Sequence, residues 1–156
     1  MPAVGNQAPN FTLPDQDLRE VVLTEELSEH GTVVLAFFPA AFSSVCTKEL
    51  CTFRDQLSNL DSLKNTRVLG ISVDTPFSLK AFSTQEALGF PLLSDFNKTV
   101  IRAYGVVNPD MIGLKDISKR AVFVIGSDRS IRHQEILDDA RLEPNYEKLY
   151  EVVKAI

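Results

Sequence analysis

The chain has 156 residues, of which 44% are hydrophobic, so it is long enough for one domain with a sizeable core and too short for a second. A formal net charge of −5, with Lys and Arg scattered along the chain, argues against a general nucleic-acid binder. Residues 1–7 carry no export signal and Pro39 interrupts the longest apolar run, so we expect a single cytoplasmic domain over residues 1–156 without a membrane span.

Strands and helices alternate behind an N-terminal hairpin. Segments 10–13 and 20–23 flank a turn, and His30 is expected near a helix end. The run 32–38 is apolar, β-branched and aromatic, as in a central strand buried on both faces. Further strands are expected at residues 67–73, 91–93, 120–125 and 130–137. Helices are expected from Ser43 or Ser44 to about residue 57, and at residues 77–88, 98–104 and 144–153.

The order of these elements predicts the fold class. Alternation of strands and helices that ends in a hairpin around residues 126–128 implies an α/β fold, with a mixed central β-sheet flanked by helices and an N-terminal β-hairpin. Gly105 and Gly113 flank a segment that contains Asn108, Pro109 and Asp110. We expect this segment to be a turn and not a phosphate cradle, since no Gly-rich strand-to-helix pattern follows it.

Cys46 lies where the buried strand gives way to a helix. Pro39 stops the strand, and Ser43 or Ser44 can cap the helix, which places Cys46 in the first helical turn. The free amide groups and aligned peptide dipoles at that end favour a thiolate, the nucleophilic form of cysteine. The alternative is that Cys46 is a small buried hydrophobic residue, as free cysteines often are. Its placement alone does not decide between the two.

The residues around Cys46 resemble the active-site signature of the peroxiredoxins. The signature is carried by Pro39, Ser43 and Cys46, and Cys51 on the same helix makes the pattern similar to the bacterioferritin-comigratory-protein branch. Three further segments resemble peroxiredoxin landmarks, at residues 11–15, 90–95 and 103–106; the last two also resemble the one-cysteine alkyl hydroperoxide reductase E group. The resemblance implies a thioredoxin-like fold and a thiol-dependent peroxidase that reduces hydrogen peroxide and organic hydroperoxides without a cofactor.

By this resemblance Cys46 is the peroxidatic nucleophile, whose thiolate attacks one peroxide oxygen in line with the O–O bond. Ser43, where family members more often carry Thr, would bond the substrate or the thiolate through its hydroxyl; its alternative role is helix capping. Pro39 would shield the sulfur from water. Backbone amides near Val45 supply further donors, and Val45 and Phe42 are expected to line the substrate pocket.

A cationic partner is needed close to the sulfur, because a helix start alone rarely stabilises a thiolate strongly. The resemblance places the family's active-site arginine at Arg120, at the start of its strand, where a guanidinium can hold a thiolate and a peroxide oxygen together. Glu49 lies one helical turn after Cys46 on the same face and can orient Arg120 through a carboxylate pair. The alternative for Glu49 is an ordinary exposed helix residue.

Cys51 is expected to be the resolving cysteine. On a helix, positions five apart have Cα atoms about 8.7 Å apart and side chains splayed by about 140°, whereas a disulfide needs less than about 7 Å. If Cys51 resolves Cys46, the first turns of the helix must unwind after the sulfenic acid forms, and a thioredoxin-like partner then reduces the disulfide. The alternative is a core cysteine in a one-cysteine enzyme that an outside thiol resolves.

Two other classes of protein fit less well. A thiol-disulfide exchange protein normally has Cys-x-x-Cys, whereas four residues separate the cysteines here. A copper carrier would want Cys-x-x-x-Cys with a histidine, and we expect no metal, because neither His30 nor His133 has a partner at metal-ligand spacing. The expected partners are hydroperoxides and a thioredoxin-like reductant, with no nucleic acid or membrane. We expect a monomer or a homodimer, with a surface around Phe42 and the Asn108 segment as the candidate contact.

Overall fold

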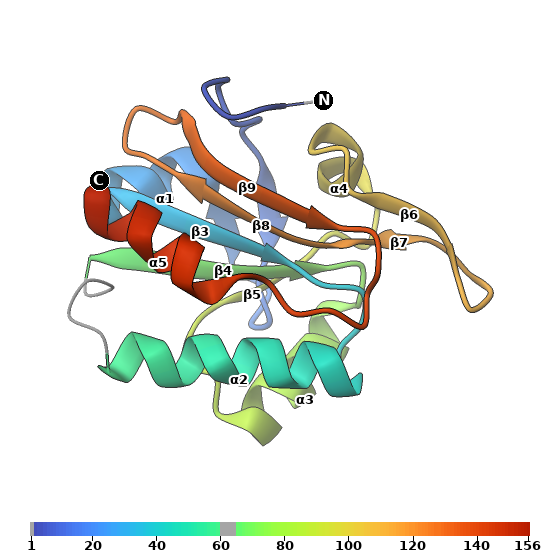
Figure 1. Ribbon diagram of the computed structural model, residues 1–156. Coiled ribbons are helices and arrows are strands. Elements are labelled where there is room, and N and C mark those ends of the chain that lie inside the picture. The colour runs from blue at the N-terminus through green and yellow to red at the C-terminus, as the bar shows by residue number, and fades with distance from the viewer. Residues whose placement is uncertain (1, 60–64) are drawn as a thin grey trace.

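The structure is a computed structural model that describes residues 2–59 and 65–156 (Figure 1). Its elements are, in chain order, β1 (Thr12–Pro14), β2 (Glu20–Val22), α1 (Leu23–His30), β3 (Thr32–Phe37), α2 (Ser44–Asn59), β4 (Thr66–Ser72), α3 (Pro76–Glu86), β5 (Leu92–Ser94), α4 (Thr99–Ala103), β6 (Val107–Met111), β7 (Leu114–Ser118), β8 (Arg120–Ile125), β9 (Ile131–Leu137) and α5 (Tyr146–Ala155).

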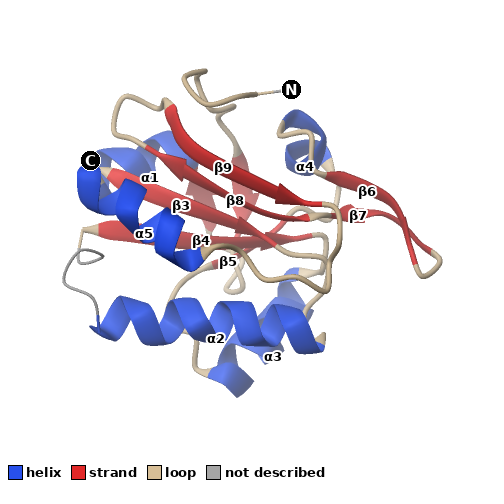
Figure 2. Ribbon diagram, viewed as in Figure 1, coloured by secondary structure: helices blue, strands red, loops and turns tan. Residues whose placement is uncertain are grey.

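The central sheet is mixed and has the strand order β5-β4-β3-β8-β9 (Figure 2). β3 runs parallel to β4 and β4 parallel to β5, whereas β8 is antiparallel to both β3 and β9. β1 and β2 form the expected N-terminal hairpin, in which Thr12 pairs with Val22. The sheet, its flanking helices and the hairpin confirm the α/β class predicted from the sequence.

Each face of the sheet carries a hydrophobic core. Successive side chains of a strand point to opposite faces, so Val33, Leu35 and Phe37 of β3 pack in one core while Val34 and Ala36 pack in the other. The first core includes residues of α1 and α4, and the second includes residues of α2, α3 and α5. Burial on both faces explains why β3 is a continuous apolar run. α2 therefore lies on the same face of the sheet as α3 and α5.

Residues 107–118 form a two-stranded ribbon, and the turn expected around Asn108 is wrong. β6 pairs with β7, with Val107 opposite Ser118. Pro109 and Asp116 fall outside this register, and Asp116 has a positive φ of 53°. Asn, Pro and Asp are uncommon in strands, which hides β6 in the sequence. The ribbon tolerates them because it projects from the body of the molecule, where its backbone is paired on one side only (Figure 1).

The helix boundaries differ from the sequence prediction by up to two residues; α3, for example, expected over residues 77–88, ends at Glu86. α1 follows β2 directly, where only a helix end near His30 was expected. α5 begins at Tyr146 and not at Pro144, because the Asn145 side chain caps it by accepting from the backbone N–H of Lys148. Within residues 2–59 and 65–156, every helix is too short or too polar to cross a lipid bilayer.

Candidate active site

Cys46 lies in the first turn of α2, a few residues after β3 ends. Phe42 has a left-handed backbone, with a φ of 67°, which turns the chain into the helix. The Ser43 carbonyl accepts from the backbone N–H of Thr47 at 2.9 Å, so Ser43 begins the helical hydrogen-bond ladder. The Cys46 side chain is 0% exposed and packs in the core beneath α2. The nucleophilic candidate is therefore a buried free thiol at a helix start.

Arg120 reaches this sulfur from the neighbouring sheet. It is the first residue of β8 and is 1% exposed, and its Nη2 donates to Sγ of Cys46 at 3.2 Å. The two residues are 74 positions apart, so the contact depends on the pairing of β8 with β3. A buried guanidinium at this distance stabilises a thiolate, because its charge is permanent and poorly screened inside the protein.

Glu49 is a second acidic group beside Arg120, in addition to the Cys46 thiol. It lies one helical turn after Cys46. It is fully buried, and its Oε1 accepts from Nη1 of Arg120 at 3.5 Å. Its Oε2 has no hydrogen-bond partner among the described residues. Burial raises the pKa of Glu49 to about 8 against the opposing effect of the Arg120 guanidinium. Burial therefore favours the protonated carboxyl, the form that leaves the guanidinium charge to the sulfur of Cys46.

The loop between β9 and α5 also holds the Arg120 guanidinium, through hydrogen bonds to a backbone carbonyl. The Ala140 carbonyl accepts from Nε and Nη2 of Arg120 at 3.3 and 2.9 Å. Asp138, two residues before Ala140, is anchored by Nζ of Lys119 at 2.7 Å. The orientation of Arg120 is thus set by groups on α2 and on this loop.

A cavity of about 790 Å³ opens beside Arg120. It is lined from α2 and the turn before it by Pro39, Ser43, Ser44 and Val45, from the ribbon by Asn108, Asp110, Met111 and Ile112, and elsewhere by Arg120, Asp138, Asp139, Ala140 and Arg141. Its volume falls in the range of about 300–1,000 Å³ that is usual for small-molecule sites. The guanidinium that holds the sulfur therefore also faces a space where a ligand fits.

Four of the residues predicted from the sequence to surround the substrate lie in this lining: Pro39, Ser43, Val45 and Arg120. The Ser43 hydroxyl donates to the Ala40 carbonyl at 3.0 Å, so the structure does not direct its proton to the sulfur of Cys46. The Ser43 oxygen can still accept a hydrogen bond from a ligand.

Phe42 lies elsewhere than the sequence predicted. It is 48% exposed and packs on Phe82 of α3, with the ring centroids 5.0 Å apart, and it is not among the residues that line the cavity. The aromatic contact with α3 explains the difference, because it holds the Phe42 ring against that helix.

Cys51 contacts a different neighbour from Cys46, although both lie on α2. Its Sγ donates to Oε2 of Glu86, the last residue of α3, at 3.4 Å. Burial raises the pKa of Cys51, and the hydrogen bond to Glu86 raises it further. Both cysteines are free thiols, and with α2 intact their helical spacing is too wide for a disulfide.

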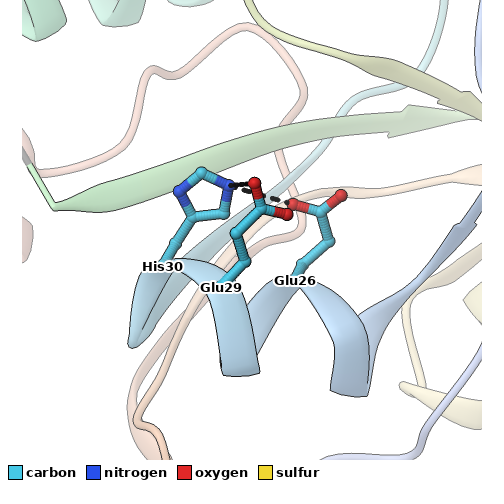
Figure 3. Close-up of side chains that lie close together, drawn as sticks. All are labelled: Glu26, Glu29 and His30. Carbon is cyan, nitrogen blue, oxygen red and sulfur yellow. Dashed lines mark ion pairs between the residues drawn. The ribbon is translucent and has the colours of Figure 1, made fainter.

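A second cluster of titratable residues lies on α1. Glu26, Glu29 and His30 have possible ligand atoms within 4.8 Å of one another, which corrects the expectation that His30 lacks partners at ligand spacing (Figure 3). Nε2 of His30 is 3.5 Å from Glu26 and 3.9 Å from Glu29. Nε of Arg67 donates to Glu26 at 3.1 Å. The same Glu26 oxygen, Oε2, therefore faces both the Arg67 guanidinium and the His30 ring.

Sequence reasoning missed two contributors to the site and one neighbour of Cys51. Ala140 contributes a backbone carbonyl, which any residue type supplies and no motif reveals. The ribbon contributes a wall of the cavity, but its polar strand was interpreted as a turn. Glu86 meets Cys51 across two helices, and neither residue signals that contact locally.

Comparisons with known proteins place this geometry in context. The AhpC/TSA family model matches residues 4–134, a range that includes Cys46, Cys51 and Arg120. Peroxiredoxin Bcp of Escherichia coli K12 is 37% identical over 147 residues, which cover 92% of this chain and 90% of that protein. A chloroplastic 2-Cys peroxiredoxin of Hordeum vulgare is 34% identical over 146 residues, which cover 87% of this chain and 67% of that protein.

Among solved structures, peroxidoxin BcpB of Mycobacterium tuberculosis superimposes with a TM-score of 0.88 at 32% sequence identity. The superposition covers 100% of this chain and 99% of that one. The similarity confirms the thioredoxin-like architecture predicted from the sequence.

Proposed function

Because the chain belongs to the AhpC/TSA family of peroxiredoxins, which are thiol-dependent peroxidases, we propose that Cys46 is the residue that attacks the hydroperoxide. The observation that carries this proposal is the 3.2 Å contact between Nη2 of Arg120 and Sγ of Cys46 in the first turn of α2. A permanent cation and the free amides of a helix start both favour the thiolate, the reactive form.

The reaction forms one bond and breaks another. The thiolate sulfur of Cys46 bonds to one peroxide oxygen while the O–O bond breaks, which leaves a sulfenic acid on Cys46. The departing oxygen takes a proton and leaves as water or as an alcohol. Nη2 of Arg120 lies where it can stabilise the charge that develops on the oxygens, and the Ser43 oxygen can accept from the peroxide O–H.

Pro39 and Glu49 support this step without taking part in bond exchange. Pro39 is buried at the inner wall of the cavity, where it keeps water from the sulfur of Cys46. Glu49 orients the guanidinium through Nη1 of Arg120, and its retained proton avoids a second negative charge beside the thiolate. Both residues therefore favour a reactive and shielded sulfur.

The shape of the cavity supports both hydrogen peroxide and organic hydroperoxides as substrates. A volume of about 790 Å³ exceeds what hydrogen peroxide needs, and the apolar side chains of Val45, Met111 and Ile112 in the lining suit an alkyl group. We expect the hydroperoxide end to lie at Arg120 and the alkyl end toward the ribbon.

Cys51 is the proposed resolving cysteine, and a thioredoxin-like protein the proposed reductant. Once Cys46 is a sulfenic acid, unwinding of the start of α2 lets the two sulfurs meet and form a disulfide. Thiol exchange with a dithiol reductant then restores both thiols. We place this cycle in one domain over residues 1–156 and in the cytoplasm, where thiol reductants are abundant.

The oligomeric state belongs to the same proposal. A monomer and a homodimer are both compatible with the site, which residues of one chain complete. The exposed side chains of Phe42, Ile112 and Leu114 offer a contact surface for a second copy. Sedimentation at rising concentration separates the two states, and a mass that stays monomeric would remove the homodimer.

The decisive test is the intact mass of the fully reduced protein after one equivalent of hydrogen peroxide, with acid quench over milliseconds to seconds. We expect a fast gain of one oxygen, then loss of water as the disulfide forms. In Cys51→Ser the added oxygen should persist. Persistence of the added oxygen in the unsubstituted protein would leave a one-cysteine peroxidase that an outside thiol resolves. No fast change in mass would overturn Cys46 as the nucleophile.

A further inference from the structure

Two side chains of α2 contact Glu86, the last residue of α3. Sγ of Cys51 donates to Oε2 of Glu86 at 3.4 Å. Nη1 of Arg54, three residues further along α2, donates to the backbone carbonyl of Glu86 at 2.6 Å. Nε2 of Gln85 donates to Oε1 of Glu86 at 3.3 Å, which fixes the other carboxylate oxygen. Cys51 is thus held against an oriented carboxylate of the neighbouring helix.

This contact keeps the second sulfur in its unreactive form. Burial and the hydrogen bond to Glu86 both raise the pKa of Cys51, so the thiol keeps its proton at neutral pH and is a weak nucleophile. A proton must therefore leave Cys51 before or during its attack on a sulfenic acid. The Glu86 carboxylate is already within hydrogen-bond distance of that proton.

We propose that Glu86 is the base that accepts the proton of Cys51 when this sulfur attacks the sulfenic acid on Cys46. The inference rests on the proposed resolving role of Cys51. The Arg54 contact adds a second element, because it anchors this part of α2 to α3. The start of the helix, with Cys46, then moves toward a Cys51 that stays beside its base.

The step is balanced without any further reagent. The proton of the Cys51 thiol passes to Oε2 of Glu86, and the freed sulfur electron pair forms the S–S bond to Cys46. The S–O bond of the sulfenic acid breaks, and its hydroxide takes up the proton that Glu86 accepted, so it leaves as water and Glu86 is again a carboxylate. The sulfur of Cys51 is oxidised and that of Cys46 is reduced, so one sulfenic acid and one thiol give one disulfide and one water.

Rapid-quench mass spectrometry with one equivalent of hydrogen peroxide separates the two steps, as gain of one oxygen followed by loss of water. Glu86→Gln keeps the size and the acceptor oxygen but removes the base. In this variant we expect loss of water at pH 7 to slow by about tenfold or more, since general bases contribute about 10²–10⁴. The slowed step should speed up with rising pH, because hydroxide must then take the proton, while the unsubstituted protein should show a flatter profile.

Two further variants distinguish a base from a structural contact. Glu86→Asp keeps a carboxylate and should restore part of the rate and the flatter pH profile. Glu151→Gln removes an exposed carboxylate on α5 and should match the unsubstituted protein in both steps. Equal rates of water loss in Glu86→Gln and the unsubstituted protein, with the same pH profile, would overturn the role of Glu86 alone. An added oxygen that persists in the unsubstituted protein would instead overturn the resolving role of Cys51.

Discussion

At the scale of single residues, the site depends on how one guanidinium is shared. Arg120 donates to the Cys46 sulfur, the Glu49 carboxyl and the Ala140 carbonyl. Two ionised acids beside one buried cation would leave an excess negative charge away from water, which is unfavourable. A protonated Glu49 avoids this, so the charge of the arginine and the fork geometry of its donors both act on the sulfur.

We predict that Arg120→Lys slows the reaction of Cys46 with hydrogen peroxide by about 10²–10³, the usual effect of losing one preorganised donor. Lysine keeps a charge but offers a single point donor, which cannot serve three acceptors from this strand position. The chain contains no Trp, so acid-quench mass spectrometry is the suitable measurement. Arg132→Lys, at an exposed position of β9, is the control, and a rate within threefold of that control would contradict the prediction.

Glu49 gives the folded state a pH dependence with a definite sign. Its pKa is raised from 4.5 to about 8, so the native state binds the extra proton between these values. Its stabilising contribution is therefore complete below about pH 4.5 and lost as the pH rises through about 8. The Gln side chain of Glu49→Gln cannot titrate, so this variant should not lose stability in this way. In the unsubstituted protein the free energy of unfolding should fall by at most about 1.4 kcal/mol per pH unit through this group.

Urea unfolding of both proteins between pH 5 and pH 8.5 measures the difference directly. The free energy of unfolding of the unsubstituted protein should fall relative to Glu49→Gln as the pH rises. Other titrating groups cancel in this comparison because both chains share them. Parallel curves over the whole range would show that Glu49 is ionised in the native protein.

At the scale of elements, the proposed cycle requires that α2 be stable enough to form the site and weak enough to open. Its first turns are tied to the loop before α5 by Nζ of Lys48, 3.0 Å from Glu143. Glu143 also accepts from the Tyr146 hydroxyl at 2.8 Å, which holds the carboxylate in place. Unwinding of the helix start breaks the ion pair, so this contact opposes disulfide formation.

We therefore predict that Lys48→Ala accelerates loss of water from the sulfenic acid by about two- to threefold. The expected effect is small because exposed ion pairs contribute only about 0.2–1 kcal/mol, and the Lys48 side chain is mostly exposed. Lys148→Ala, which removes a pair with Glu151 on α5, is the matched control. The acceleration should vanish at high salt, and a slower step in Lys48→Ala would reverse the interpretation.

At the scale of the whole molecule, the N-terminal segment is joined to the core through Tyr104. Its buried hydroxyl donates to the Pro9 carbonyl at 2.6 Å. Tyr104→Phe should lower the free energy of unfolding by about 1 kcal/mol, because the half-buried Pro9 carbonyl loses its partner. The reaction of Cys46 with peroxide should be unchanged.

Tyr150 provides the comparison for this prediction. Its buried hydroxyl has no hydrogen-bond partner among the described residues, so Tyr150→Phe removes an unsatisfied group and should keep or raise stability. Urea unfolding of both variants, with quench measurements of the oxidation step, gives the comparison. Equal stability losses in the two variants would contradict the proposed value of the Pro9 hydrogen bond.

The parts of the molecule that the sequence predicts well are those with strong local patterns. β8 begins and ends where expected and β3 within one residue, because strands buried on both faces are continuous apolar runs. The resemblance around Cys46 led to Arg120, which the structure places beside the sulfur. The ribbon, the Ala140 carbonyl and Glu86 were missed because pairing and packing between distant segments create them, and no residue there signals its partner.

The wall of the cavity that the ribbon forms lies outside the central sheet, unlike the rest of the site. β6 and β7 pair with each other outside the central sheet, and Ile112 at the tip is 91% exposed. Substitutions at this tip disturb neither core. Changes at Val107, which packs against the first core at the base of the ribbon, or at Cys46 and Arg120 alter groups packed within the fold. Selection can thus reshape what enters the cavity while it leaves the reacting sulfur intact, so closely related chains can diverge in substrate preference through this hairpin alone.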